Sequence, residues 1–68
     1  MSSSTYKVTE IVGTSPEGVD QAIRNALDKA SQSLHGLDWF EVHEVRGVID
    51  EGKVGYFQVL LKVGFKLD

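Results

Sequence analysis

The sequence contains no cysteine, and other residue types that stabilise small folds are scarce. Among its 68 residues there are one proline, one tryptophan and two histidines. Without cysteine the chain has neither disulfides nor thiolate metal ligands, and its two scattered histidines do not make a convincing zinc site. A chain this short buries only about 60% of its unfolded surface, and such folds usually gain stability from disulfides, metals or subunit contacts. We therefore expect association between copies of the chain.

The charge balance and the lack of long apolar runs exclude two classes of partner. Seven basic and ten acidic residues give a formal net charge of −3, and no basic block is present, so we expect no nucleic acid partner. The longest apolar runs are too short to cross a bilayer, so we expect no membrane partner. Residues 1–5 lack the charged and apolar regions of a signal peptide. We expect a cytoplasmic protein whose residues 1–4 are disordered.

The first half of the chain predicts a strand followed by a helix. Residues 6–12 are rich in β-branched and aromatic side chains, which favours a strand. Ser15 is the expected N-cap of the helix, and Pro16 occupies the expected first helical position. Apolar residues then recur at three- and four-residue steps up to about His35. Gly36 is suited to end the helix.

The second half predicts a β-hairpin, with strands at residues 38–49 and 54–67 and a turn at residues 50–52. The helix carries the chain back, so the first and second strands should run in the same direction and the third opposite to both. Placing the third strand in the centre gives an antiparallel sheet of order 1-3-2 with the helix on one face. We therefore predict an α+β fold, β-α-β-β, in a single domain spanning residues 1–68.

Side-chain alternation places the single tryptophan on the face of the sheet that turns away from the helix, here called the outer face. Phe40 must share the helix side with the apolar residues of the last strand, so Trp39 points to the outer face. His43 and Gln58 have the same predicted orientation. The apolar patch expected on this face consists of Trp39, Val45, Tyr56 and Leu60. Such a patch indicates partner subunits or a ligand.

Two features of the hairpin limit this prediction. Trp39 and Gln58 are offset by roughly four to six residues, on the order of 15 Å, so one small ligand reaches both more easily between two chains. Glu44 and Arg46 place two charges at helix-side positions. Either a bulge shifts the alternation there, or the end of the hairpin extends beyond the helix.

The outer face suits an aromatic, hydrogen-bonding ligand. Trp39 offers a wide π-surface for stacking, and the amide of Gln58 offers an acceptor and two donors that can bind the edge of a heterocycle. Arg46 could bind a phosphate, and His43 could line a pocket. The alternative is that Trp39 only fills an interface between subunits. No nucleophile–base pair or metal-binding group is evident, so we expect no enzymatic activity.

Three segments together resemble the dodecins, a family of small flavin-binding β-α-β-β proteins: VTEIVGTSPEGVDQAI, LDWFEVHEVRG and YFQVLLKVGFKL. The resemblance runs from about Tyr6 to Leu67. It implies a hollow homododecamer of 23 symmetry, in which paired flavins stack between the tryptophans of symmetry-related chains. By this resemblance Trp39 stacks on the flavin, Gln58 binds the isoalloxazine edge, and Arg46 contacts the phosphate of FMN or coenzyme A. The role of His43 stays open.

The resemblance further implies flavin storage rather than turnover, with FMN, riboflavin or FAD as the ligand. An indole stacked on a flavin can quench its excited state by electron transfer, and a closed cavity leaves little room for a substrate. Sequestration and photoprotection follow from this arrangement. The alternatives are a structural oligomeric shell or interaction module without flavin, and a small enzyme such as a tautomerase. The latter enzymes use an N-terminal proline, which is absent here.

Overall fold

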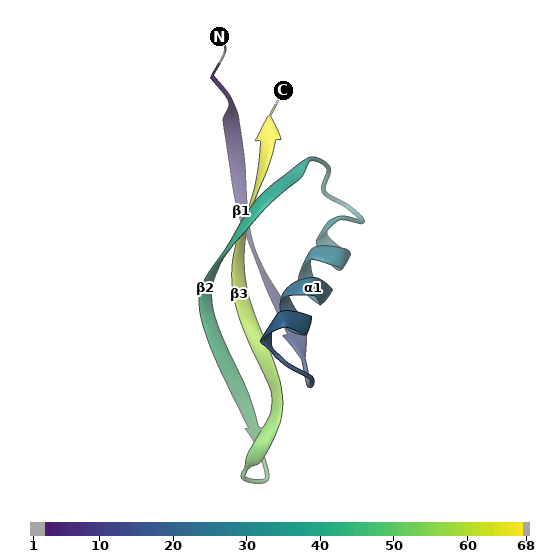
Figure 1. Ribbon diagram of the computed structural model, residues 1–68, viewed down its shortest axis with the longest axis vertical. Helices are drawn as coiled ribbons and strands as arrows, with labels where there is room; N and C mark the ends of the chain where they lie inside the picture. The colour runs from purple at the N-terminus through teal and green to yellow at the C-terminus, as the bar shows by residue number, and fades with distance from the viewer. Residues whose placement is uncertain (1–2, 68) are drawn as a thin grey trace.

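The structure, a computed structural model, describes residues 3–67 (Figure 1). Its elements are, in chain order, strand β1 (Thr5–Ser15), helix α1 (Val19–Ala30), strand β2 (Leu37–Asp50) and strand β3 (Lys53–Leu67). The sheet has the order β1-β3-β2, and β3 runs antiparallel to both neighbours. The predicted β-α-β-β arrangement is therefore confirmed. The expectation of disorder over residues 1–4 includes residues 1 and 2, which lie outside the described residues.

The hairpin turn follows the predicted chemistry. Glu51 and Gly52 have positive φ angles of 51° and 76°, and they lie between the paired residues Asp50 and Lys53. Positive φ at both central residues is typical of the tight turn whose twist matches that of the flanking strands. The turn therefore allows β2 and β3 to pair along almost their full length. Figure 1 shows this hairpin extending past the helix, at the end of the molecule opposite the two termini.

The helix begins later than the sequence predicted. Ser15 is the last residue of β1 and is buried. Its Oγ accepts a hydrogen bond of 3.0 Å from the backbone N–H of Glu17, so the hydroxyl stabilises the turn after the strand. The N-cap of α1 is Gly18, which provides no side-chain cap. The prediction of Ser15 as the N-cap was wrong because the same side-chain chemistry serves turns and helix starts.

The helix also ends earlier than predicted. After Ala30 the chain continues into a tight turn over residues 31–33, in which Gln32 and Ser33 donate to backbone carbonyls three residues earlier. The predicted end near His35 was wrong because this turn keeps Leu34 at a helix-like spacing without continuing the helix. Gly36, with φ of 75°, then leads the chain into β2.

The core lies between α1 and the β1–β3 half of the sheet. Ala22 and Ala26 of the helix pack against Val59 and Leu61 of β3, and all four are buried. The small side chains of the two alanines allow the helix to approach β1 closely. At Gly13 a Cβ atom would lie 2.1 Å from the backbone oxygen of Ala22. The closest approach of helix and sheet therefore requires a glycine.

Strand β2 receives little cover from the helix. Its helix-side apolar residues remain exposed: Phe40 by 45%, Val42 by 43% and Val45 by 52%. Each has an apolar partner on β3, but none of the three belongs to the buried core cluster beneath the helix. An exposed apolar row of this kind is typical of surfaces that contact a partner.

A bulge at His43 changes the alternation along β2. Val42 pairs with Leu61 and Glu44 pairs with Leu60, so His43 is an extra residue on β2. Of the two explanations left open by the sequence, the bulge is therefore present. Beyond it the strand is shifted by one residue, and Val45 pairs with the buried Val59. The prediction that Val45 lies on the outer face was wrong, because the shift turns it to the helix side.

Candidate functional site

The indole of Trp39 lies on the outer face of the sheet, directly over Gly64. Trp39 is paired with Gly64, and the neighbouring Val63 is buried on the helix side, so Gly64 presents its other face outward. A Cβ atom at Gly64 would lie only 2.2 Å from Cε2 of the indole. Trp39 remains 41% exposed. The predicted orientation of Trp39 is therefore confirmed, and the glycine provides the surface on which the ring rests.

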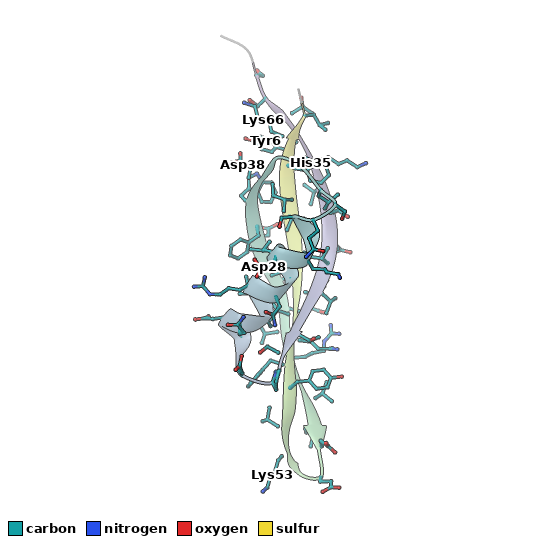
Figure 2. All side chains as sticks on the ribbon, turned by 90° about the vertical axis from the view of Figure 1, so that its right-hand side faces the viewer. Tyr6, Asp28, His35, Asp38, Lys53 and Lys66 are labelled. Atoms are coloured by element: carbon teal, nitrogen blue, oxygen red, sulfur yellow. The ribbon has the colours of Figure 1, made fainter. Side chains whose placement is uncertain are left out.

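Tyr6 of β1 reaches across the central strand to the same indole. The ring centroids of Tyr6 and Trp39 are 6.1 Å apart, with an interplanar angle of 46°. The Tyr6 hydroxyl donates a hydrogen bond of 2.8 Å to Oδ2 of Asp38, the residue preceding Trp39. Figure 2 shows Tyr6 and Asp38 near each other toward the end of the sheet that carries the termini. Trp39 thus belongs to a cluster with residues of all three strands.

The hydrogen bond has an electrostatic consequence for the phenol. It raises the pKa of Tyr6 above the ordinary value of 10.0, and burial and the negative charge of Asp38 act in the same direction. All three effects disfavour the phenolate, because it could not donate to the carboxylate and would be repelled by it. Tyr6 therefore stays protonated, and its hydroxyl remains a donor, throughout the neutral range.

A second group of candidate residues lies further along the outer face. Arg46 pairs with Gln58 of β3, and Gln58 pairs with Thr14 of β1. Nη2 of Arg46 lies 2.5 Å from Oε1 of Glu44, and the guanidinium side chain is 52% exposed. A guanidinium has five N–H donors, so this ion pair leaves donors available for an anionic oxygen. Because of the bulge, Arg46 and not Val45 lies on the outer face beside Gln58.

His43 and a band of charges separate the two groups. Nε2 of His43 lies 3.1 Å from Oε1 of Glu41. Glu41 pairs with Lys62, which in turn pairs with Glu10 of β1. The imidazole therefore contacts a carboxylate on the outer face, as its predicted orientation requires, but it contacts neither the indole nor Gln58 within the described hydrogen bonds.

The two groups are too far apart for one small ring to touch both within a chain. Gly64, beneath the indole, and Gln58 are six residues apart on β3, which corresponds to about 20 Å. This offset lies at the upper end of the predicted range. Each chain therefore carries two separate groups on its outer face, an aromatic one at Trp39 and a polar one at Gln58 and Arg46, here called the candidate half-sites.

Sequence reasoning did not assign a role to Gly64, Tyr6 or Asp38. The signal available for Gly64 was its lack of a side chain on a strand that faces Trp39. Asp38 lies at a second irregularity, because the pairing shifts between Leu37 and Trp39. Simple alternation could not place the Asp38 carboxylate beside Tyr6, since that position depends on the irregularity.

Two other kinds of feature are not found among the described residues. Within residues 3–67, no three His, Cys, Asp or Glu side chains are grouped so that they could hold a metal ion. In the same part of the chain, no helix has the length and apolar character needed to span a membrane. Because an exposed aromatic ring offers a surface for stacking, the indole of Trp39 marks the outer face as the candidate binding surface.

Comparisons with known proteins agree over nearly the whole chain. The family model described as Dodecin matches residues 5–68. The dodecin of Thermus thermophilus is 54% identical over 63 residues, which are 93% of this chain and 91% of that protein. The calcium dodecin of Mycobacterium tuberculosis is 37% identical over 65 residues, 94% of this chain and 90% of that protein. The solved structure of a dodecin from Streptomyces davaonensis has a TM-score of 0.93 at 66% identity, covering 98% of both chains.

Proposed function

The chain belongs to the dodecin family, and from this premise we propose that it binds flavins in a homododecamer, storing and protecting them without catalysing a reaction. The observation that carries the proposal is the position of Trp39. Its indole rests on Gly64, on the side of the sheet away from the helix, and it is 41% exposed. An isolated chain gains little from holding its one tryptophan in this position, whereas a flat ligand gains a stacking surface.

Stacking provides the main attraction in this proposal. One side of the indole is turned to Gly64, which leaves the opposite side for the isoalloxazine ring. Stacking of a planar heterocycle on an aromatic side chain contributes about 1–3 kcal/mol. The Trp39 side chains of two symmetry-related chains hold a pair of flavins between them. Electron transfer from the indole then quenches the excited flavin, which suits photoprotection in the cytoplasm.

The second half-site comes from a neighbouring chain. Gln58 is about 20 Å from Trp39 within one chain, so the flavin that stacks on Trp39 is bound by Gln58 of another subunit. The amide binds the polar edge of the isoalloxazine ring. This geometry makes the site incomplete without assembly and links binding to the hollow dodecamer of 23 symmetry.

The exposed apolar surface supports self-assembly. The helix-side row of β2 is about half exposed, and Ile49 and Val54 near the hairpin tip are 77% and 61% exposed. Burying such side chains fully stabilises by about 1.5–3 kcal/mol each. Contacts between copies of the chain can therefore provide the stability that the small single-chain core lacks.

We assign Arg46 and His43 to the binding of ligands that carry a phosphate. Arg46 lies opposite Gln58 and has exposed donors, so we assign it to the phosphate of FMN or FAD, or to coenzyme A. His43, the bulge residue three positions before Arg46, is hydrogen-bonded to Glu41 and borders this position. Riboflavin, which lacks a phosphate, depends on Trp39 and Gln58 alone.

The test is a titration of the purified protein with riboflavin, followed by flavin fluorescence and by native mass analysis. The proposal predicts strong quenching on binding and flavin-loaded dodecamers. A large assembly without flavin affinity would instead support the structural shell. Because one relative carries calcium in its name, a parallel titration with calcium alone distinguishes a cation-binding protein from a flavin-binding one.

A second experiment tests the polar half-site. Gln58→Ala should change the order in which riboflavin, FMN and lumichrome bind, because the amide recognises the edge of the ring and not its surface. Arg46→Ala should weaken the binding of FMN and leave the binding of riboflavin unchanged. If both variants keep the parent's ranking of these ligands, the assignment of this half-site is wrong.

A further inference from the structure

We infer that Tyr6, held by Asp38, is a positioning residue that fixes the plane in which Trp39 presents its indole. The effect of Tyr6 on flavin binding rests on the proposed function, whereas its effect on the order of the indole does not. Tyr6 is paired with Lys66, so it neither lies over Gly64 nor belongs to the polar half-site. Three contacts support this role, two of the indole itself and one of Tyr6 with Asp38.

The first contact supports the indole from below. Gly64 lies under the ring, and a Cβ there would come within 2.2 Å, 2.3 Å and 2.8 Å of Cε2, Cζ2 and Cδ2. This support stops the ring from moving toward the sheet. A flat backbone surface does not prevent the ring from sliding over it, however, so a second restraint is needed at its side.

The second contact supplies that lateral restraint. Trp39 lies on β2, an edge strand, so no further strand flanks it on one side. On the other side Tyr6 of β1 lies across the central strand, with a centroid distance of 6.1 Å and a tilt of 46°. Tilted aromatic pairs at this distance contribute about 0.5–1.5 kcal/mol beyond the burial of their area. The tyrosine ring therefore limits movement of the indole toward the centre of the sheet.

The third contact fixes the tyrosine itself. Its hydroxyl donates to Asp38 at 2.8 Å, and Asp38 immediately precedes Trp39 at an irregularity in the β2–β3 pairing. β1 and β2 are not neighbours in the sheet, so this bond joins the two edge strands directly over β3. The phenol ring is thereby held at both ends, and its restraint is passed to the backbone that carries the indole.

A positioning role makes a different prediction from a purely structural tie. A structural tie would change only the stability of the sheet. A positioning residue changes the order of the indole in the flavin-free protein and the affinity of the stacked ring. Because the chain has one tryptophan, its near-ultraviolet circular dichroism bands and its fluorescence anisotropy report that one side chain.

The experiment compares Tyr6→Leu, Tyr6→Phe and Asp38→Asn in the full-length, assembled protein. We expect Tyr6→Leu to reduce the tryptophan dichroism of the flavin-free protein and to weaken riboflavin binding about two- to tenfold, the loss of one aromatic pair. Tyr6→Phe keeps the ring but loses the hydrogen bond to Asp38, so its tryptophan dichroism and its riboflavin affinity should fall between those of Tyr6→Leu and the parent. Asp38→Asn should follow Tyr6→Phe.

Tyr56→Leu is the matched control. Tyr56 also lies on the outer face, and like Tyr6 it is 37% exposed, but its cross-strand partner is Val48 rather than a residue of the tryptophan cluster. The inference is overturned if Tyr6→Leu and Asp38→Asn change the dichroism and the riboflavin affinity no more than Tyr56→Leu does. If Tyr6→Leu does not fold, Asp38→Asn, a change at an exposed pair, decides the outcome. If the parent binds no riboflavin, the proposed function fails, and the dichroism of the flavin-free variants still decides the role of Tyr6.

Discussion

Glycine at position 64 has the clearest local consequence in this structure, because it determines where the only tryptophan can lie. The sequence predicted the outward orientation of Trp39 from the alternation around Phe40, and the structure confirms it. The sequence did not fix the register of the hairpin, so it could not say which residue of the last strand faces Trp39. Only the observed register shows that the indole rests on a residue without a side chain.

Replacing this glycine should move the indole. Gly64→Ala introduces a Cβ within 2.2 Å of the ring, and overpacking of this kind typically costs about 1–3 kcal/mol. We expect riboflavin affinity to fall about fivefold to 100-fold if the cost falls on the bound geometry. Isothermal titration measures this change. Gly47→Ala is the control, because its Cβ would meet only Tyr56 O at 3.9 Å. Equal affinities for the two variants would contradict the role of Gly64 as the surface on which the indole rests.

The pKa of Tyr6 gives a second residue-scale prediction. Its pKa in the folded protein is raised, chiefly by donation to Asp38, so the stabilisation from this hydrogen bond is complete below the unfolded value of about 10. That contribution is lost as the pH rises through the folded pKa. In a Tyr56→Phe background, Tyr6 is the only tyrosine and its phenolate absorbance can be titrated. Asp38→Asn should lower the midpoint, and an unchanged midpoint would contradict the hydrogen bond as its cause.

The elements show where pattern reasoning succeeded and where it failed. The turn at residues 50–52 was predicted correctly, since Gly52 readily adopts the positive φ of 76° found there. The bulge was only half predictable. Charges at Glu44 and Arg46 signalled a break in alternation, but not that His43 would be the extra residue. The position of the bulge determines whether Arg46 or Val45 faces outward, and therefore which residues make up the polar half-site.

The packing of the helix on β1 depends on one position. Gly13 lies where a Cβ would come within 2.1 Å of the Ala22 backbone oxygen and 2.7 Å of the Ala26 Cβ. Backbone cannot move aside as a side chain can, so Gly13→Ala should destabilise the fold by about 1–3 kcal/mol or more. Denaturant unfolding measures the change. Gly18→Ala, where an added Cβ meets nothing within 4 Å, should cost much less. The close approach would be disproved by equal midpoints for the two variants.

At the scale of the whole molecule, the elongated chain measures 55 × 21 × 14 Å and has a thin core on one half of its sheet. Length and the absence of cysteine predicted the need for subunit contacts. The sequence could not show that the exposed apolar surface is concentrated on β2, because the position of the helix over β1 and β3 depends on three-dimensional packing. The dodecamer itself remains a proposal.

Assembly has a direct prediction. Twelve chains of 7.5 kDa give a particle of about 90 kDa, which native mass spectrometry or light scattering should detect. Val45→Asp places a charge on the uncovered row of β2, where Val45 is 52% exposed. We expect smaller species, because a buried unpaired charge is costly at an interface. Val45→Thr, which keeps the shape of the side chain, serves as the control. A Val45→Asp protein of unchanged size would exclude this row from the interface.

The central claim is that the exposed indole of Trp39 binds flavin by stacking. The most direct measurement is a titration of riboflavin into the parent and into Trp39→Ala, followed by flavin fluorescence. We predict that the parent quenches the flavin strongly and that the variant binds more weakly by about 1–3 kcal/mol, with the remaining bound flavin less quenched. Equal affinity and equal quenching in the two proteins would contradict the claim.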